Sequence, residues 1–413
     1  MWFNIKKIII SFIVICLLFN TNVFKIDLID GKSNNFQIFE HYQNLPKPPT
    51  SWISPFRHII GSNDEGSHDR NDSYHQEWWY YIAFFNLEDS ELKNWSMMVS
   101  FNQMGITDML FCVIFDEEKN SYGGVINELK GTMNASNTNV DVKFLNSIIK
   151  GKYPEWDIYA EYIIPNKVNV AVNVTYKTKS LPMWLFMNMG HNRSKSRIGH
   201  YCIIESDVNG TVKINDTTYK VHGLGYHEHS WINVKQHNST KQFSLPQKNI
   251  KDDIPEWQLL LDVWDWGSIF LDNGWNIFIA KICQQSKISK VLPGSLWITP
   301  DGENVTECRY FKLEYLETKE TTIPTIEIPI KIHIKAMFFN VFIRYPLEGL
   351  VRLDLYIEVK NLREFTWDGL DFSAGVWEAP CKVYGTLKWG RNCIQLNGCA
   401  MLELTRAAKT DNN

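Results

Sequence analysis

Two short runs place acids and histidines among large aromatic residues: His75–Tyr81 (HQEWWYY) and Gly223–Trp231 (GLGYHEHSW). Apolar surroundings disfavour the charged form of a carboxyl group unless it is paired or hydrogen-bonded. A carboxylic acid kept neutral in this way can donate a proton to an apolar substrate. These runs therefore predict catalytic roles for Glu228, Glu77 and His229.

The first run divides between two faces if it forms a strand, because alternate side chains of a strand point the same way. Glu77, Trp79 and Tyr81 then share one face, and Trp78 and Tyr80 share the other. Either face presents a wide aromatic wall. An equally open interpretation is that Glu77 pairs with a basic or histidine partner and only stabilises the fold.

The second run divides in the same way, with Tyr226 and Glu228 on one face and His227, His229 and Trp231 on the other. Its glycines permit a bend or bulge that redirects side chains. We expect Glu228, or a histidine of this run, to protonate an isolated alkene, after which water captures the tertiary cation. Ring faces of Trp78, Trp79, Tyr226 and Trp231 would stabilise that cation by about 0.5–2 kcal/mol for each good contact. The residues expected to bind substrate are His75, Trp78, Trp79, Tyr81, Tyr226, His227 and Trp231.

Histidine spacing also raises the question of a metal. His227 and His229 form a His-x-His pair, with His222 and Glu228 close in sequence and His75 as a more distant ligand. No CxxC or HExxH motif accompanies them, so we expect histidines lining a pocket, with no metal and no cofactor. The chain also lacks a Walker loop, a GxGxxG fingerprint and a GxSxG elbow, so nucleotide and serine-hydrolase chemistry have no support.

Two further motifs follow in order: Trp377–Gly385 (WEAPCKVYG) and Met401–Thr405 (MLELT). Together, the four motifs resemble the AttH-like, hydroxyneurosporene synthase family, which includes carotenoid 1,2-hydratases, kievitone hydratase and, more distantly, fungal Diels–Alderases. The resemblance spans roughly residues 50 to 406. Two positions depart from it: Glu228 stands where many relatives carry Asp, and Ile232 stands where they often have Gly.

This resemblance implies two lipocalin-like halves, a pocket at or between them, and a hydratase reaction (a hydro-lyase) on an isoprenoid or polyketide-like molecule. A cyclase or pericyclase on the same scaffold is the alternative enzyme. A non-catalytic envelope protein that binds a hydrophobic ligand is the alternative from another class. Fold-level analogy does not choose among the three.

Composition favours strands: aromatic residues make up 14% of the chain, and Val, Ile and Tyr are plentiful. Short apolar or alternating runs recur between turn signals, with no sustained helical period, which predicts an all-β protein of two antiparallel barrels or sandwiches. The resemblance implies that both are lipocalin-like. The predicted domains are 45–240 and 256–408, joined by a polar, proline-bearing linker at 241–255. Hairpin turns are expected at Asn209-Gly210 and Asn273-Gly274.

The amino-terminal segment 1–22 has a basic start and a short apolar run, which predicts a signal peptide or an uncleaved anchor. N-x-S/T sequons agree with export to the cell surface, a lumen or the medium as a glycoprotein. They lie at Asn71, Asn94, Asn134, Asn173, Asn192, Asn209, Asn215, Asn238 and Asn304. The net charge of −4 is mixed along the chain and predicts no nucleic-acid partner.

Two other features stay open at this stage. The apolar segment Leu181–Gly190 does not fit the strand pattern, and with the basic residues after it could make a peripheral membrane contact, gate a lipid pocket or plug a barrel. Cys381 with Cys393 or Cys399 is the expected local disulfide, against the alternative of buried thiols. The sequence does not predict an oligomeric state.

Overall fold

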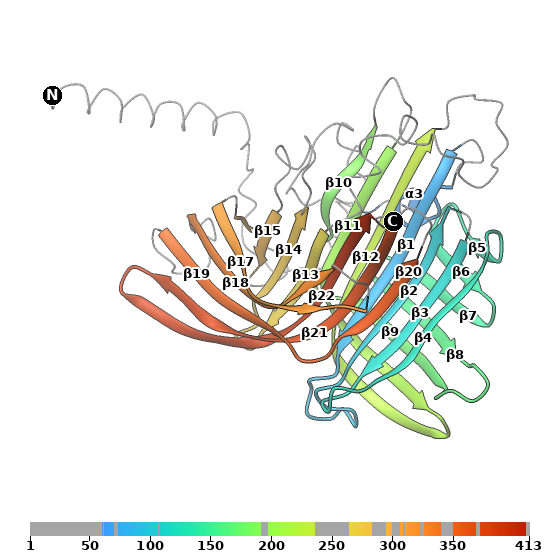
Figure 1. The fold of residues 1–413 in the computed structure, drawn as a ribbon, viewed down its shortest axis with the longest axis horizontal. Coiled ribbons are helices and arrows are strands. Elements are labelled where there is room, and N and C mark those ends of the chain that lie inside the picture. The colour runs from blue at the N-terminus through green and yellow to red at the C-terminus, as the bar shows by residue number, and fades with distance from the viewer. Residues whose placement is uncertain are drawn as a thin grey trace, which may run out of the picture. The chain divides into compact units, whose positions relative to one another are not determined.

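The computed structural model describes residues 60, 62–69, 73–105, 107–190, 197–235, 264–282, 295–299, 306–308, 310–322, 326–339, 350–368 and 372–409. All of them belong to the compact unit Pro48–Asn413. Apart from one helical turn, α3 (Ser62–Glu65), the regular elements of this part of the chain are strands (Figure 1). The all-β prediction is confirmed. None of the helices in the described ranges has the length and apolar character needed to span a membrane.

The first sheet has 12 antiparallel strands, in the order β4-β3-β2-β1-β12-β11-β9-β8-β7-β6-β5, with β10 also paired to β11. Its strands are β1 (Ser73–Phe84), β2 (Ser96–Met104), β3 (Thr107–Phe115), β4 (Ser121–Leu129), β5 (Met133–Ala135), β6 (Val140–Phe144), β7 (Ser147–Lys152), β8 (Glu155–Tyr162), β9 (Val170–Thr178), β10 (Met183–Gly190), β11 (Arg197–Ile214) and β12 (Thr217–Lys235).

The second sheet has 10 antiparallel strands, in the order β16-β15-β14-β13-β22-β21-β19-β18-β17, with β20 also paired to β21. Its strands are β13 (Trp264–Leu271), β14 (Asn276–Ile282), β15 (Ser295–Thr299), β16 (Thr306–Glu307), β17 (Tyr310–Glu320), β18 (Glu327–Phe339), β19 (Leu350–Val359), β20 (Arg363–Asp368), β21 (Phe372–Trp389) and β22 (Asn392–Lys409).

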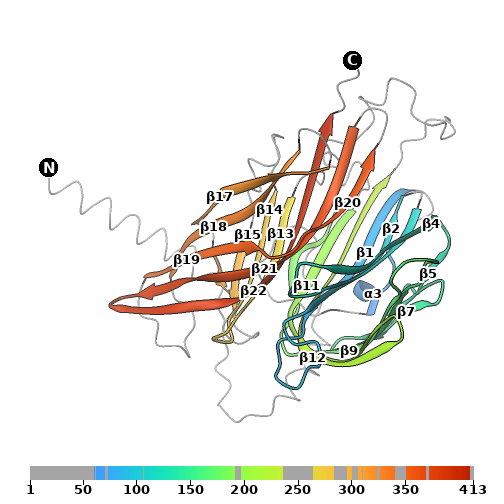
Figure 2. The ribbon, with the colours of Figure 1, turned by 60° about the horizontal axis from the view of Figure 1, so that its bottom comes forward.

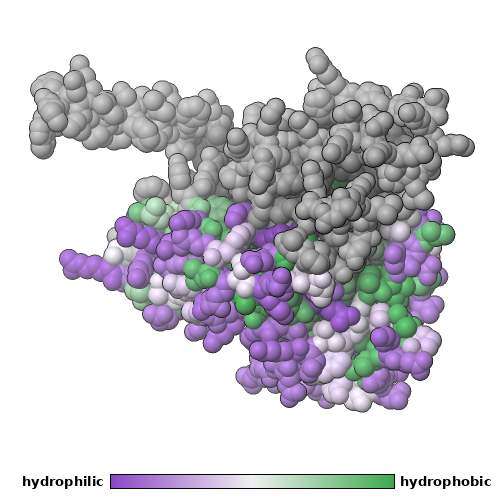
Figure 3. Space-filling model, in the orientation of Figure 1, coloured by the Kyte–Doolittle hydropathy of each residue, from purple (hydrophilic) through white to green (hydrophobic). Residues whose placement is uncertain are grey.

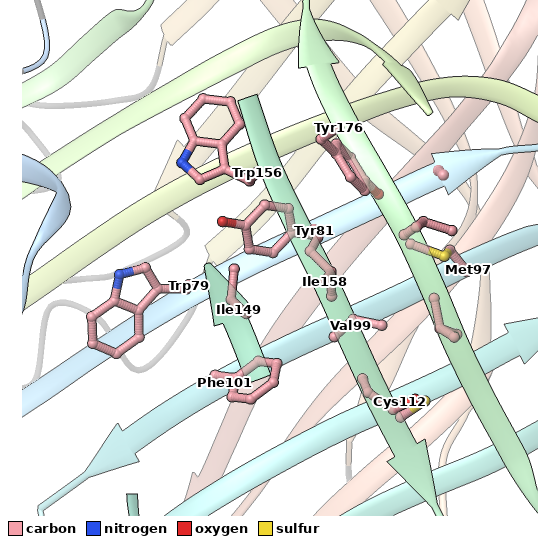
Figure 4. Packing of buried hydrophobic residues seen from close by; sticks show 14 of the residues in the cluster. Trp79, Tyr81, Met97, Val99, Phe101, Cys112, Ile149, Trp156, Ile158 and Tyr176 are labelled. Atoms are coloured by element: carbon pink, nitrogen blue, oxygen red, sulfur yellow. Dashed lines mark hydrogen bonds between the residues drawn. The ribbon is translucent and has the colours of Figure 1, made fainter. Parts of the chain in front are cut away.

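The first sheet curls around its own hydrophobic core (Figure 2). Strict alternation along its strands turns every second side chain inward, as in β8, whose inward residues include Trp156 and Ile158. These pack with Tyr81 from β1 and Tyr176 from β9 (Figure 4). The thiol of Cys112 in β3 reaches a backbone carbonyl of β8 at 3.9 Å, so strands far apart in the sheet order meet across the core.

The turn α3 and the loop after it lie against this first core. The Glu65 carboxylate accepts hydrogen bonds from the Tyr153 N–H at 2.7 Å and from the Trp156 indole at 3.1 Å. Its backbone carbonyl accepts one from the Trp79 indole at 3.2 Å. Burial raises the pKa of Glu65 to about 7. Segment 62–69 is therefore held to β1 and β8 by buried polar contacts.

The second sheet encloses a separate core built from the inward residues of β13–β15, β17–β19, β21 and β22. The Tyr315 hydroxyl, on β17, donates to Asp265 on β13 and accepts from Lys281 on β14, the latter at 3.2 Å. The end strand β17 thus meets β13 and β14, which lie far from it in the sheet order, and this sheet curls as the first one does.

A third hydrophobic layer joins the two sheets. It contains residues of both, including Tyr80, Ile82 and Tyr226 from the first and Phe278 and Met401 from the second. Phe84 and Phe270 meet edge to face across it, with ring centroids 5.7 Å apart. Outward-facing side chains of β1 and β12 are therefore buried too, and these two strands have hydrophobic surroundings on both faces. On the surface seen in Figure 3, by contrast, hydrophilic residues predominate and hydrophobic residues lie in small groups.

Some local predictions hold and others do not. Asn273-Gly274 does form the turn between β13 and β14. Asn209-Gly210 lies inside β11, and the hairpin instead turns at Asn215, whose φ is 51°. Gly210 is needed for a different reason: a Cβ there would lie 2.1 Å from the Asn173 carbonyl of the neighbouring strand.

Two further expectations are corrected. The segment Leu181–Gly190 fits the strand pattern after all, because Met183–Gly190 forms β10 and pairs with β11. Cys381, Cys393 and Cys399 are free thiols. In the β21–β22 register Cys381 lies opposite Ala400, and Cys399 lies opposite Lys382, so the two cysteines are not directly paired. The predicted segment 1–22 and the linker 241–255 lie outside the described residues.

Candidate active site

The register of β1 and β12 decides which of the predicted residues meet. Glu77 lies opposite Trp231, and Tyr80 lies opposite Glu228. Because side chains alternate along both strands, the predicted residues divide between the two faces of this strand pair. His75, Glu77, Trp79, Tyr81, His227, His229 and Trp231 are buried on the face of the first core, whereas Trp78, Tyr226 and Glu228 face the layer between the sheets.

Glu77 is surrounded by imidazoles. Its carboxylate oxygens lie 2.9 Å from His68 Nδ1, 3.0 Å from His75 Nε2 and 2.9 Å from His229 Nε2. They also accept the Ser67 hydroxyl and the His68 backbone N–H, each at 3.0 Å. His68 itself stacks flat on Trp231, with ring centroids 3.6 Å apart.

This environment keeps Glu77 charged. Burial alone would raise its pKa, but the hydrogen bonds from His229, His68 and His75 outweigh burial and hold the pKa well below the ordinary value. Burial opposes charge on the histidines as well; it lowers the pKa of His229, whereas the contact with Glu77 leaves the pKa of His75 raised. An ionised, donor-saturated carboxylate has no proton to give, so Glu77 does not suit the role of an acid.

Glu228 has the opposite environment. Its Oε1 accepts the Trp78 indole N–H at 3.0 Å, and its Oε2 accepts the Trp266 indole N–H at 2.6 Å and the Tyr226 hydroxyl. Trp266 belongs to β13, so both sheets contribute to this contact. Trp78 and Trp266 are each only partly buried, whereas Glu228 is 3% exposed.

Glu228 is predominantly neutral at pH 7. Burial raises its pKa to about 8, and repulsion from Glu403 adds to the rise, although the donors Tyr226, Trp78 and Trp266 favour the charged form. This is the protonation state that a general acid needs near neutral pH.

Two more carboxyl groups face Glu228 from the second sheet, and the sequence reasoning did not predict either as a site residue. Glu378 on β21 accepts the Tyr80 hydroxyl at 2.8 Å, and Glu403, opposite it on β22, accepts the Trp264 indole at 2.5 Å. Burial raises the pKa of both, and for Glu378 repulsion from Glu403 raises it further. Both residues belong to the carboxy-terminal motifs, and this was the sequence feature that could have indicated them as site residues.

His200 on β11 is a further neighbour that the sequence did not single out. Its Nε2 lies 4.0 Å from Glu228 Oε2 and has no hydrogen-bond partner among the described residues. The ring meets Trp266 edge to face at 4.7 Å. Burial lowers the pKa of His200 to about 3, so its ring is neutral at pH 7 and only weakly basic.

The four-residue metal set suggested by the sequence is not assembled. His222 lies at the surface and contacts Asp89 at 2.9 Å, and Glu228 faces away from His227 and His229. A different group could hold a metal: the ligand atoms of His68, Glu77 and His229 all lie within 4.8 Å of one another.

Comparison with known proteins identifies the fold. No protein-family model matches the sequence, and a search of curated proteins found no match. Among solved structures, an AttH-like protein from Nitrosomonas europaea is similar with a TM-score of 0.54 at 14% identity, over 85% of this chain and 98% of the other. Kievitone hydratase from Nectria haematococca is similar with a TM-score of 0.51 at 11% identity, over 87% of this chain and 97% of the other.

The chain has the AttH-like fold. This confirms, at the level of the fold, the resemblance that the four motifs indicated. Within the AttH-like fold, the first two motifs supply the paired strands β1 and β12, and the last two supply β21 and β22. The first motif contacts the third, because the Tyr80 hydroxyl donates to Glu378. Glu228 of the second motif accepts a hydrogen bond from Trp266, which lies on β13 of the second sheet.

Proposed function

We propose that this protein is a hydratase that adds water across a carbon–carbon double bond of an apolar, isoprenoid or polyketide-like molecule, with Glu228 as the acid. The observation that carries the proposal is a neutral, buried carboxyl group between two partly exposed indoles, those of Trp78 and Trp266. Similarity to kievitone hydratase supports the reaction class but does not identify the substrate.

In the proposed reaction, the alkene π electrons take the carboxyl proton of Glu228, which forms a C–H bond and leaves a tertiary cation. The carboxylate that remains keeps three donors, so its charge is stabilised at the moment it forms. The ring faces of Trp78, Trp266 and Tyr226 stabilise the cation. Trp79 and Trp231, which the sequence placed with this group, face the first core and take no part.

A water molecule then attacks the cation and must lose one proton. His200 is placed to receive it, because its neutral ring presents an unpartnered Nε2 at 4.0 Å from Glu228 Oε2. Transfer of that proton back to the Glu228 carboxylate completes the cycle. The alcohol product has gained one water, and no other reactant is consumed.

We also propose that the reaction takes place outside the cytosol. A leader at residues 1–22 and sequons along the chain favour an exported glycoprotein acting on a cell-surface or lumenal lipid. Every sequon asparagine whose side chain the structure describes is exposed, as glycosylation requires: Asn94, Asn134, Asn173, Asn209 and Asn215.

The test is to incubate the protein with an organic extract of host lipids in oxygen-18 water and to analyse the products by mass spectrometry. A protein-dependent product that gains one labelled water supports hydration and identifies the substrate. A product of unchanged mass but altered retention would instead assign a cyclase or pericyclase. Recovery of an unaltered bound lipid would indicate a ligand-binding protein without turnover.

Two matched variants locate the acid. Glu228→Gln should lower turnover by about 10²–10⁴-fold, the usual contribution of a general acid. Glu65→Gln is the control, because Glu65 is also buried with a raised pKa but accepts its hydrogen bonds in the first core. Full turnover by Glu228→Gln would exclude the acid role.

A further inference from the structure

The cluster around Glu77 takes no part in the proposed reaction and has a chemistry of its own. Three imidazoles converge on one carboxylate, and Glu77, His75 and His229 have no exposed side-chain surface. The ring-nitrogen and carboxylate atoms of His68, Glu77 and His229 lie within 4.8 Å of one another. His75 Nε2 approaches the second carboxylate oxygen at 3.0 Å.

The hydrogen bonds behind these rings fix which nitrogen carries a proton. His229 Nδ1 lies 2.9 Å from the Asp64 carbonyl, and a carbonyl oxygen only accepts, so this nitrogen is the donor. The Asn233 amide nitrogen donates to the His68 carbonyl at 3.0 Å, which turns the Asn233 oxygen toward His75 Nδ1 at 2.8 Å. His75 Nδ1 is therefore a donor as well.

A neutral imidazole that donates from Nδ1 presents a lone pair at Nε2. Both of these lone pairs would point at oxygens of Glu77, 2.9 and 3.0 Å away, and two acceptors repel at that distance. A proton or a metal ion must therefore lie between each nitrogen and its oxygen. One metal ion shared by the group would satisfy both contacts at once, without two extra protons in a buried cluster.

We propose that His68, His75, His229 and Glu77 form a structural site for a divalent transition metal of the zinc class. Three imidazoles and one carboxylate are a ligand set that suits Zn²⁺, and an Nδ1–H held by an oxygen acceptor is the usual support of a histidine that binds metal through Nε2. Tetrahedral ligands at Zn–N and Zn–O lengths stand about 3.3 Å apart. The contacts of 2.9–3.0 Å between the histidines and Glu77 would open by a few tenths of an ångström, and the ligand atoms of His68, Glu77 and His229 already lie within 4.8 Å of one another.

With His75 as the fourth ligand the ion would have no open position, which is the arrangement of a structural zinc rather than a catalytic one. Its ligands join the loop after α3 to β1 and β12, so the ion would fasten segment 62–69 to the sheet. The metal site lies on the opposite face of β1 and β12 from Glu228. Loss of the metal site would therefore leave the proposed hydratase reaction untouched, and failure of the hydratase test would leave the metal site untouched.

The test uses the full chain after removal of metals with a chelator. Zn²⁺ content is measured by mass spectrometry after dialysis, and Co²⁺ is titrated while its visible absorption is followed. We expect about one ion per chain, a Tm that falls when the chelator is added, and recovery of the Tm when Zn²⁺ is returned. Absence of bound metal together with a chelator-insensitive Tm in the wild-type protein would overturn the site without recourse to any variant.

Matched variants then assign the ligands. His229→Gln should lose the ion, whereas His227→Gln should keep it, because His227 is also buried on β12 and donates from Nδ1 to a carbonyl at 3.2 Å but does not contact Glu77. Asn233→Ala should weaken Co²⁺ affinity by about 10–100-fold, the usual effect of removing a partner of a ligating histidine. Equal binding by wild type and His229→Gln would show adventitious metal and contradict the proposal.

Discussion

Glu77 and Glu228 lie three residues apart in the register of β1 and β12, yet they face opposite sides of the sheet. An odd offset separates side chains on paired strands, as it does along one strand. The same strand pair therefore carries an ionised carboxylate held by imidazoles on one face and a neutral carboxyl group held by indoles on the other.

The rate of hydration should fall as the pH rises through about 8. Glu228 must be protonated to act as the acid, and burial raises its pKa to about 8 in the presence of Glu378, Glu403, Tyr226, Tyr80 and neutral His200. A profile of kcat/KM against pH measures this limb in the free enzyme. A rate that is still rising at pH 9 would exclude Glu228 as the acid.

Removal of one indole donor should move that limb. In Trp266→Phe the ring that packs on Phe278 is retained, but the N–H that donates to Glu228 at 2.6 Å is lost. Since this donor favours the charged carboxylate, its loss should raise the pKa of Glu228 and shift the alkaline limit upward. Trp297→Phe is the control, because the Trp297 N–H has no partner among the described residues. An unchanged limit in Trp266→Phe, or an equal shift in both variants, would contradict the assignment.

Stability should decrease between about pH 6.5 and pH 8, above the range in which His200, His227 and His229, whose pKa values burial lowers, take up protons on unfolding. Burial raises the pKa of Glu228 to about 8 and of Glu65 to about 7, both above the 4.5 of an unperturbed Glu. In this window the folded chain holds protons that the unfolded chain releases, so the free energy of unfolding falls as the pH rises. Urea unfolding at several pH values measures the trend. Glu228→Gln should flatten it, and an upward trend would contradict the raised pKa values.

Gly199→Ala should destabilise the protein by about 1–3 kcal/mol. A Cβ at this position would lie 2.1 Å from the Trp231 ring, which cannot retreat because it stacks on His68 at 3.6 Å. Thermal unfolding of Gly199→Ala, Trp231→Phe and the double variant tests this cause. A smaller ring should relieve the clash, so the two substitutions should couple; purely additive losses would argue against the contact.

Glycan occupancy tests the proposed export. Protein produced through a eukaryotic secretory route should carry N-glycans at exposed sequons such as Asn94 and Asn173, seen as a mass loss after enzymatic deglycosylation. Asn94→Gln and Asn173→Gln should each remove one glycan. An unglycosylated product from that route would count against an exported glycoprotein.

The faces of β1 and β12 could be predicted from the sequence because strand periodicity is local. Alternation alone separated Glu77 from Trp78 and Glu228 from His229, and the structure places them so. Register is not local. Nothing near His200 indicates that its ring would come within 4.0 Å of Glu228, because that contact depends on how β11 pairs with β12.

The acids of the second sheet illustrate the same limit. Glu378 and Glu403 lie in the two carboxy-terminal motifs, but only the packing of one sheet on the other brings them toward Glu228. Local turn chemistry misled at Asn209-Gly210, where the close approach of a neighbouring strand, rather than a hairpin, requires the glycine. Long-range contacts therefore account for most of what the sequence did not predict.

The alternation along β12 also has a consequence for substitutions. Substitutions at Tyr226 and Glu228 alter the layer between the sheets, whereas substitutions at His227 and His229 alter the first core. The two sets of positions can therefore be substituted independently, because each set contacts a different hydrophobic layer. Alternate residues of one strand, β12, thus belong to two separate layers of the protein.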